Sequence, residues 1–244
     1  MITSELFGTA PCGTPVHRYT LNGPEICVRI MDYGATVLGI DVPDIPGNVR
    51  DVVLGFDKLE DYFDNPACFG ATIGPVANRT AGATITIAGT DWHMPANEGA
   101  NNLHSDLEHG LHKRVWDVEL DEVHNAVRMT TSLEDGELGL PGNRTFTAVF
   151  TVTRTGVFRV EYAVRGDGPL IRVHDAKRSL IVLHNRFVRI IRQKYSAEAK
   201  SVENRLIFIV FERLRYGKRG EAATEARQCH CGAVWYLPEY FARG

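Results

Sequence analysis

The 244-residue sequence has no long hydrophobic run and few cysteines. Its longest apolar stretches, such as residues 206–211, have the length of a strand, so no membrane-spanning segment is expected. The five cysteines are scattered apart from Cys229 and Cys231, which indicates reduced thiols and not a disulfide framework. Because no basic start with a following apolar block opens the sequence, we expect no signal peptide and predict a cytoplasmic protein.

The sequence also lacks the short motifs of several enzyme classes. It has no G-x-S-x-G nucleophile turn, no Walker loop and no dinucleotide-binding fingerprint. The stretch HSDLEHGLHK holds His104, His109 and His112 with Asp106 and Glu108, but their spacing matches no familiar zinc pattern. The CHC cluster near the C-terminus has no second pair beside it. We therefore expect neither a metal nor another cofactor.

Charge is unevenly distributed along the chain. Residues 1–165 hold 12 Lys and Arg against 22 Asp and Glu, a net charge of −10, whereas residues 166–244 hold 15 against 8, a net charge of +7. The basic residues are spread among apolar ones, and no nucleic-acid-binding motif accompanies them, so we expect no nucleic-acid partner. We instead divide the chain into a sandwich portion, residues 1–169, and a basic segment, residues 170–244.

The first two-thirds of the chain shows the alternation of apolar and polar residues that indicates β-strands. Glycine or asparagine separates the alternating runs, and hairpin turns are predicted at Gly89, at 124–125 and at 155–156. Residues 57–63 resemble a short helical turn. Strands at such short spacing favour an antiparallel sandwich or barrel over alternating strands and helices. We therefore predict an all-β fold, a large antiparallel β-sandwich.

The pattern changes after about residue 169. Residues 196–227 are rich in residues that favour helix, whereas their centre LIFIVF, residues 206–211, fits a buried strand equally well. The turn residues that punctuate the first part are largely missing. The C-terminal region is therefore atypical, and helix and strand both stay open for it.

Two polar stretches at the ends of apolar runs form a candidate ligand site: VANRTAG, residues 76–82, and NNLHS, residues 101–105. The guanidinium of Arg79 offers several N–H donors, and Asn78 both donates and accepts, so the pair suits vicinal hydroxyls or a ring oxygen. His104 can donate one hydrogen bond and accept another near neutral pH. Each of these residues, taken alone, is more often an ordinary surface side chain.

Several motifs follow one another in a fixed order between Asp32 and Asn143: DYGATVLGIDVPD, DVVLGFDKLEDY, FGATIGPVANRTAG, NEGANNLHS, HKRVWDVE and SLEDGELGLPGN. Together they resemble the aldose 1-epimerase (galactose mutarotase) family over about residues 7–169. The resemblance implies a β-supersandwich that interconverts the α and β anomers of free hexoses, such as glucose or galactose, without a cofactor. It also implies that Asn78, Arg79 and His104 contact the sugar, with Arg79 and His104 as catalytic residues.

The sequence departs from the family pattern inside the candidate site. Pro75 stands where the family usually has arginine, and Ser105-Asp106 stands where it often has two glycines. Both changes fall in loops, where we expect them to be tolerated.

The family's proton donor and base are not found in recognisable motifs. The donor histidine is expected near Lys177, and the nearby His174 and His184 lack the surrounding motif. Unsupported candidates for the glutamate base are Glu221, Glu225 and Glu239.

Three functions therefore stay open. The first is anomer interconversion by acid–base ring opening and closure. The second is a non-catalytic carbohydrate-binding protein or a truncated, inactive mutarotase relative. The third is a hexose-6-phosphate epimerase. The sequence around Arg79 has no extra basic cluster to receive a phosphate, which counts against this function.

Overall fold

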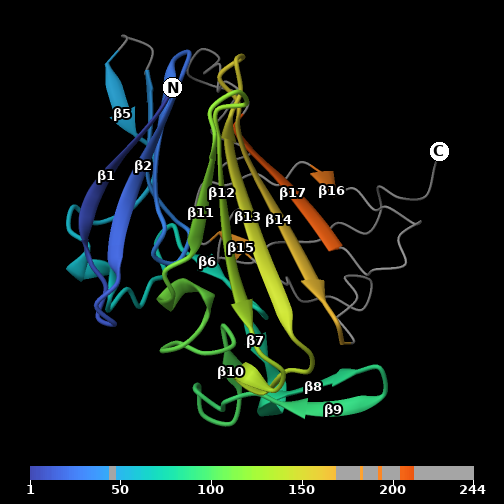
Figure 1. The fold of residues 1–244 in the computed structure, drawn as a ribbon. Helices are drawn as coiled ribbons and strands as arrows, with labels where there is room; N and C mark the ends of the chain where they lie inside the picture. Colours follow the sequence, from blue (N-terminus) through green and yellow to red (C-terminus); the bar gives the residue numbers. More distant parts are fainter. Residues whose placement is uncertain (44–47, 169–181, 184–191, 194–203, 212–244) are drawn as a thin grey trace, which may run out of the picture.

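Two antiparallel sheets form the body of the computed structural model, which describes residues 1–43, 48–168, 182–183, 192–193 and 204–211. The first sheet has the strand order β1-β2-β3-β4-β5 and the second the order β11-β12-β13-β14-β17-β16 (Figure 1). The first sheet consists of β1 (Ile2–Thr9), β2 (Pro15–Gly23), β3 (Ile26–Met31), β4 (Thr36–Pro43) and β5 (Val49–Asp51). The second consists of β11 (Asp117–Asp121), β12 (Ala126–Leu133), β13 (Arg144–Val152), β14 (Phe158–Gly166), β16 (Arg192–Gln193) and β17 (Asn204–Phe211).

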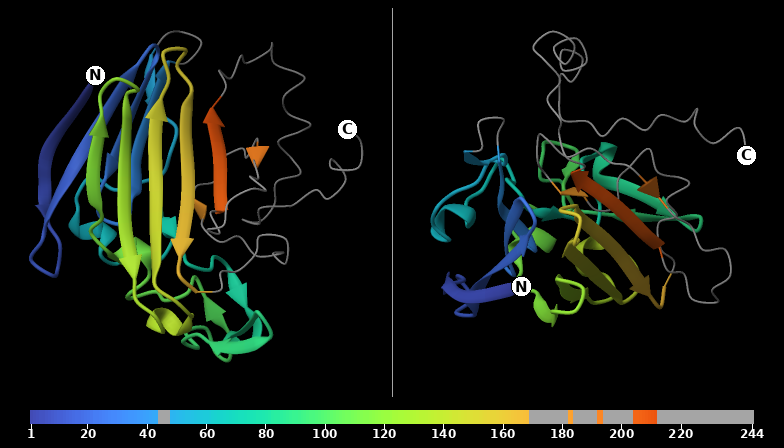
Figure 2. Two further views of the ribbon diagram at one scale, coloured as in Figure 1. Left: turned by 45° about the vertical axis from the view of Figure 1, so that its right-hand side comes forward. Right: turned by 90° about the horizontal axis from the view of Figure 1, so that it is seen from above.

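The remaining strands of the described residues form three short antiparallel ladders. They pair β7 (Arg79–Thr80) with β10 (Asn102–Leu103), β8 (Thr84–Ile87) with β9 (Thr90–His93), and β6 (Thr72–Ile73) with β15 (Val182–Leu183). The helical elements of the described residues are the 3-10 turns η1 (Glu60–Tyr62), η2 (Ala81–Ala83), η3 (Leu111–Lys113) and η4 (Glu137–Gly139). The ladders β7–β10 and β8–β9 lie together beyond one end of the second sheet, at the bottom of Figure 1 and of the left view of Figure 2.

The two sheets pack against each other through one apolar cluster. Leu21 and Ile30 from the first sheet meet Val127, Met129 and Phe150 from the second, and all five side chains are fully buried. Alternation along β13 and β14 places every second side chain from Phe146 to Val152 and from Phe158 to Val164 in this core. Each large apolar side chain buried in this way contributes roughly 1.5–3 kcal/mol relative to an exposed one. The predicted antiparallel β-sandwich is confirmed.

The hairpin turns and the helical turn also agree with the sequence-based expectations. Gly89, Asn125 and Gly156 all have positive φ in turns between paired strands. The helical turn expected within residues 57–63 is a 3-10 turn, η1. Of the two alternatives for LIFIVF, the structure has the strand, β17, which pairs with β14. Residues 196–203 and 212–227, also considered for helix, lie outside the described part of the chain.

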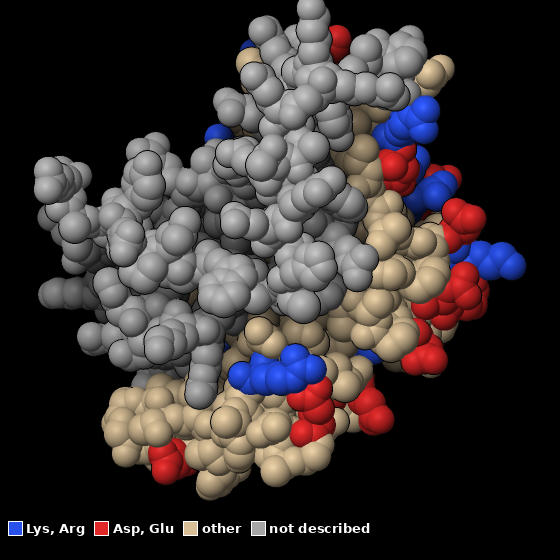
Figure 3. All heavy atoms as spheres, turned by 180° about the vertical axis from the view of Figure 1, so that it is seen from behind, with Lys and Arg blue, Asp and Glu red and all other residues tan. Residues whose placement is uncertain are grey.

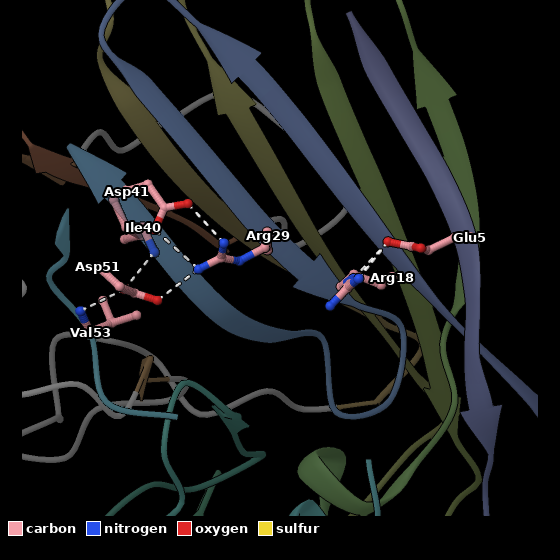
Figure 4. A network of polar contacts seen from close by, with 7 residues as sticks. All are labelled: Glu5, Arg18, Arg29, Ile40, Asp41, Asp51 and Val53. Atoms are coloured by element: carbon pink, nitrogen blue, oxygen red, sulfur yellow. Dashed lines mark hydrogen bonds and ion pairs between the residues drawn. The ribbon is translucent and has the colours of Figure 1, made fainter. Parts of the chain in front are cut away.

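Charged side chains of both signs pair on the first sheet. Arg29 donates hydrogen bonds to Asp41 and Asp51, which ties β5 to β3 and β4, and Arg18 donates to Glu5 across β1 and β2 (Figure 4). The face seen in Figure 3 likewise shows Lys and Arg next to Asp and Glu. Within the described residues, no helix has the length and apolar character needed to cross a membrane.

Candidate functional site

The β7–β10 ladder joins the two polar stretches that the sequence singled out. Arg79 is in register with Leu103, so Asn78 lies opposite His104. The backbone amide of Asn78 donates to Nδ1 of His104 over 2.9 Å, and the amide of His104 donates to the carbonyl oxygen of Asn78 over 3.1 Å. The structure thus brings Asn78, Arg79 and His104 together, with Asn78 and Arg79 exposed and His104 half-buried.

The hydrogen bond from the Asn78 amide determines which nitrogen of the neutral His104 ring carries the proton. A backbone N–H can only donate, so Nδ1 must accept, and the proton of the neutral ring then resides on Nε2. His104 is therefore a hydrogen-bond donor at Nε2. Asn78 and His104 both have left-handed backbones, with φ of 65° and 59°. This conformation costs about 1–2 kcal/mol per residue, and the reciprocal hydrogen bonds offset part of that cost.

Arg79 is held by a carboxylate that the sequence did not single out. Its Nε and Nη2 donate to Oε2 and Oε1 of Glu98 over 2.6 and 2.7 Å, a parallel two-bond pair. The hydrogen bonds and charge of Glu98 raise the pKa of Arg79. Such pairing fixes the plane of a guanidinium, which single-bond contacts do not. The hydrogen bonds of Arg79 to the described residues use Nε and Nη2, so Nη1 offers its N–H groups on the edge away from Glu98.

Asparagine side chains build the loop that carries Glu98 and His104. Asn97 hydrogen-bonds to both the amide and the carbonyl of Leu103. Asn101 accepts from the amide of Gly82. Asn102, fully buried, donates to the carbonyls of Pro95 and Ser105. Asparagine amides substitute for backbone partners in such loops, which gives a loop without regular pairing a defined shape.

Ser105 joins the stretches 76–82 and 101–105 through buried hydrogen bonds. Its hydroxyl accepts from the amide of Val76 over 2.7 Å and donates to the carbonyl of Val76 over 3.0 Å. Ser105 is fully buried. The departure from the family pattern at this position is therefore more than a tolerated loop change, because the serine adds contacts that a glycine lacks. Pro75, the other departure, follows Gly74 through a cis peptide bond.

The histidine-rich stretch after His104 does not converge on one point. His109 is exposed and pairs with Asp106, whereas His112 is 5% exposed and packs beneath the loop. Burial, together with the positive charges of Lys113 and His104, lowers the pKa of His112 to about 4. Among the described residues, no group of His, Cys, Asp and Glu is arranged to hold a metal ion.

A buried arginine shapes a loop that packs against the site. Arg144, 5% exposed, donates to the carbonyl oxygens of Glu134, Glu137, Leu140 and Gly142. It thereby shapes the loop of the SLEDGELGLPGN motif. Its charge is balanced by nearby carboxylates, of which Glu137 also pairs with Arg114.

This loop contacts the site through an apolar cluster. Leu140 packs with Val76, Met94 and the β8 side chains Ile85 and Ile87. Val76 is the residue that Ser105 holds, and it lies two residues before Asn78. The position of Asn78 and Arg79 therefore depends on packing as well as on hydrogen bonds.

Other candidate residues from the sequence are not part of the described structure. These are His174, His184, Glu221, Glu225 and Glu239, together with the position of Lys177 near which the donor histidine was expected. Conversely, sequence reasoning missed Glu98, Asn97, Asn102 and Ser105. The available signal was local: a carboxylate and three asparagines within a few residues of His104, in a stretch rich in turn formers.

Comparison with known proteins identifies the family to which this sequence belongs. A sequence model of the aldose 1-epimerase family matches residues 17–171. Galactose mutarotase of Bos taurus is 35% identical over 152 residues, which cover 62% of this chain and 44% of the relative. Aldose 1-epimerase of Escherichia coli K12 is 35% identical over 161 residues, which cover 66% of this chain and 46% of the relative.

Solved structures give the same class of fold. Galactose 1-epimerase from Lactobacillus acidophilus superposes with a TM-score of 0.60 at 22% identity, over 68% of this chain and 49% of the other, which shows the fold alone. The GalM/aldose epimerase homologue from C. elegans gives a TM-score of 0.57 at 28% identity, over 61% of this chain and 45% of the other.

The fold and the matched residues define an antiparallel sandwich of the sugar-epimerase class. This chain belongs to the aldose 1-epimerase family. It spans less than half the length of the relatives named above.

Proposed function

We propose that this chain binds a free hexose, such as glucose or galactose, and interconverts its α and β anomers in the cytoplasm. Asn78, Arg79 and His104 are the proposed sugar contacts, and Arg79 and His104 the proposed catalytic residues. The proposal rests on family membership together with one observation: the hydrogen-bonded ladder that sets His104 beside Asn78 and Arg79.

The reaction explains why these residue types are needed. In mutarotation the anomeric hydroxyl loses a proton while the ring oxygen gains one. The bond between C1 and the ring oxygen breaks in the same step, which leaves an aldehyde at C1 and a hydroxyl in place of the ring oxygen. C1 turns about the C1–C2 bond, and this hydroxyl attacks the other face of the aldehyde while the protons return. Partial negative charge develops on the ring oxygen as its bond to C1 lengthens ahead of full proton transfer. The Nε2–H of His104 and the N–H groups of Arg79 are donors suited to stabilise that charge.

Optical rotation of freshly dissolved α-glucose and α-galactose tests this proposal. We expect the wild-type chain to accelerate the change of rotation above the buffer rate. Removing one preorganised donor typically costs about 10²–10³-fold in rate, so Arg79→Ala and His104→Ala should each lose most of the acceleration. Arg128→Ala is the matched control, because Arg128 is an exposed arginine on β12, outside the β7–β10 ladder.

Equal acceleration by the wild type and both variants, with unchanged circular dichroism, would contradict the proposed roles. A wild-type chain that accelerates nothing would contradict the catalytic part of the proposal. Binding must then be measured separately.

A non-catalytic sugar-binding protein is the second candidate. The observation that favours it is the coverage: the match to the relatives takes in less than half of their length. Saturable binding of glucose or galactose by titration calorimetry, without acceleration of mutarotation, would support the binder over the enzyme. Loss of sugar binding in Arg79→Ala would show that the sugar binds at the proposed contact residues.

A further inference from the structure

We infer that Glu98 is a specificity-determining residue, which makes the site around Arg79 accept neutral sugars and disfavour phosphorylated ones. The inference rests on the proposed function, since it names the substrate class of the same site. It follows from the parallel pairing of one carboxylate with the guanidinium that the site would use.

The pairing divides the donors of Arg79 between two edges. Nε and Nη2 face the carboxylate of Glu98 at 2.6 and 2.7 Å. A phosphate binds arginine best through the same kind of parallel two-bond contact. Because Glu98 already occupies the Nε–Nη2 edge, a phosphate can pair with that edge only by displacing the carboxylate. On the remaining Nη1–Nη2 edge it would bind beside the negative charge of Glu98, which repels it. A sugar hydroxyl or ring oxygen needs a single N–H and does not compete for that edge.

The pairing also removes the net charge that an anion would seek. Arg79 and Glu98 carry opposite unit charges a few ångströms apart, so the pair is electrically neutral at longer range. A neutral polar edge still donates hydrogen bonds to hydroxyls. A phosphate group would meet the Glu98 carboxylate and be repelled.

The conformation of the loop places Glu98 next to Arg79. Glu98 and Asn101 exchange backbone hydrogen bonds of 3.0 Å in both directions, across a turn in which Gly99 has a φ of 61°. The side chain of Asn101 is in turn fixed to Gly82, just after β7. The backbone that carries Glu98 is therefore fixed next to the β7–β10 ladder, and the carboxylate reaches Arg79 from there.

Stability does not account for this pair. The side chain of Arg79 is 61% exposed and that of Glu98 is 35% exposed. Exposed ion pairs contribute little to folding. The pair Arg18–Glu5 on the first sheet has the same chemistry, with side-chain exposures of 32% and 58%, and lies among the strands β1 and β2 (Figure 4). It offers a matched control.

The test compares the wild-type chain with Glu98→Gln and Glu5→Gln. Glutamine keeps the size of the side chain but removes its charge. Calorimetry gives the affinities for glucose and glucose 6-phosphate. In Glu98→Gln, we expect the ratio of the two affinities to shift toward the phosphate on the order of tenfold at low salt, and less at high salt. Glu5→Gln should leave the ratio unchanged, and both variants should unfold at the wild-type temperature.

A second measurement does not depend on any sugar. Phenylglyoxal modifies accessible guanidinium groups, and peptide mass spectrometry follows Arg79 alone. We expect Arg79 to react several-fold faster in Glu98→Gln than in the wild type, as an unpaired guanidinium should. Inorganic phosphate should protect Arg79 in the variant and not in the wild type.

The outcomes separate this inference from the proposed function. A wild-type chain that neither binds nor isomerises glucose would contradict the proposed function, while phosphate protection confined to Glu98→Gln would still support the role of Glu98. An unchanged affinity ratio, or identical Arg79 reactivity in both proteins, would overturn the role of Glu98 even if glucose is a substrate. A wild-type preference for glucose 6-phosphate would overturn both.

Discussion

The hydroxyl of Ser105 hydrogen-bonds to both backbone groups of Val76, at 2.7 Å from the amide nitrogen and 3.0 Å from the carbonyl oxygen. These residues are 29 positions apart, and each belongs to one of the two stretches that meet at the candidate site. One buried side chain therefore joins both halves of the site. The backbone of Ser105 is left-handed, with a φ of 64°, a conformation that costs an L-residue free energy.

Ser105→Ala should destabilise the protein by about 2–4 kcal/mol, because it leaves two buried backbone groups without their partner. Ser105→Gly loses the same hydrogen bonds, but glycine adopts positive φ without strain, so it should be about 1 kcal/mol more stable than the alanine variant. Urea denaturation gives both free energies of unfolding.

Ser132→Ala is the control for these variants. The hydroxyl of Ser132 is exposed on the second sheet and contacts only Thr145 among the described residues, so its loss should cost less than about 0.5 kcal/mol. If Ser105→Ala is as stable as Ser132→Ala, the Ser105 hydroxyl does not hold the two stretches together.

The tautomer of His104 can be observed directly. Because the Asn78 amide donates to Nδ1, we expect the neutral ring to carry its proton on Nε2. Long-range ¹H–¹⁵N correlation spectra at pH 8 should show a protonated Nε2 and an unprotonated Nδ1. The exposed His124, which pairs with Asp121, provides an internal comparison in the same spectrum. A proton on Nδ1 would be incompatible with the contact to Asn78.

Much of the sandwich could be predicted because its signals are local. Alternation with period two places Phe146 and Phe150 on one face of β13, and both are buried. Turn residues such as Gly89 require a positive φ that few other residues tolerate. The strand LIFIVF could not be assigned from the sequence, because a short apolar run fits a buried strand and a buried helix alike.

The candidate site was predictable only in part, for a physical reason. Asn78, Arg79 and His104 stood out by residue type and by family resemblance. Glu98 and Ser105 act through partners 19 and 29 positions away. Such pairings depend on the register of the β7–β10 ladder, and a two-residue ladder leaves no periodic pattern in the sequence.

Arg144→Met should be among the most destabilising single changes. Arg144 is buried and donates to several carbonyl oxygens of the loop that ends β12. Removing it leaves these buried carbonyl oxygens without their donor and takes away a positive charge near the carboxylate of Glu137, at a cost on the order of 3–5 kcal/mol. Thermal unfolding followed by circular dichroism measures the loss.

Arg144→Lys separates charge from geometry. A lysine keeps the positive charge, but its single ammonium cannot reach the same set of carbonyls, so most of the destabilisation should persist. Arg128→Met, at an exposed arginine, should change stability by less than about 0.5 kcal/mol. Full stability of Arg144→Lys would show that charge alone matters at this position.

His112 should make the protein sensitive to acid. Its pKa is about 4 in the folded protein, against 6.5 as the ordinary value. Between these values the unfolded chain binds a proton that the folded chain does not. The free energy of unfolding should therefore fall as the pH is lowered from about 6.5 toward 4, by at most about 3 kcal/mol for this group, and be fully restored above pH 7.

His112→Gln isolates this contribution, because glutamine can keep a donor toward the backbone of Leu107 but does not titrate. Carboxylates also affect stability in acid, so the decisive quantity is the difference between wild type and variant at each pH. We expect the wild type to lose stability relative to the variant as the pH falls from 7 to 4. His109→Gln makes the same replacement at an exposed histidine of this stretch and is the control for the substitution itself. Parallel curves for the wild type and His112→Gln would mean that His112 is not held neutral in the folded protein.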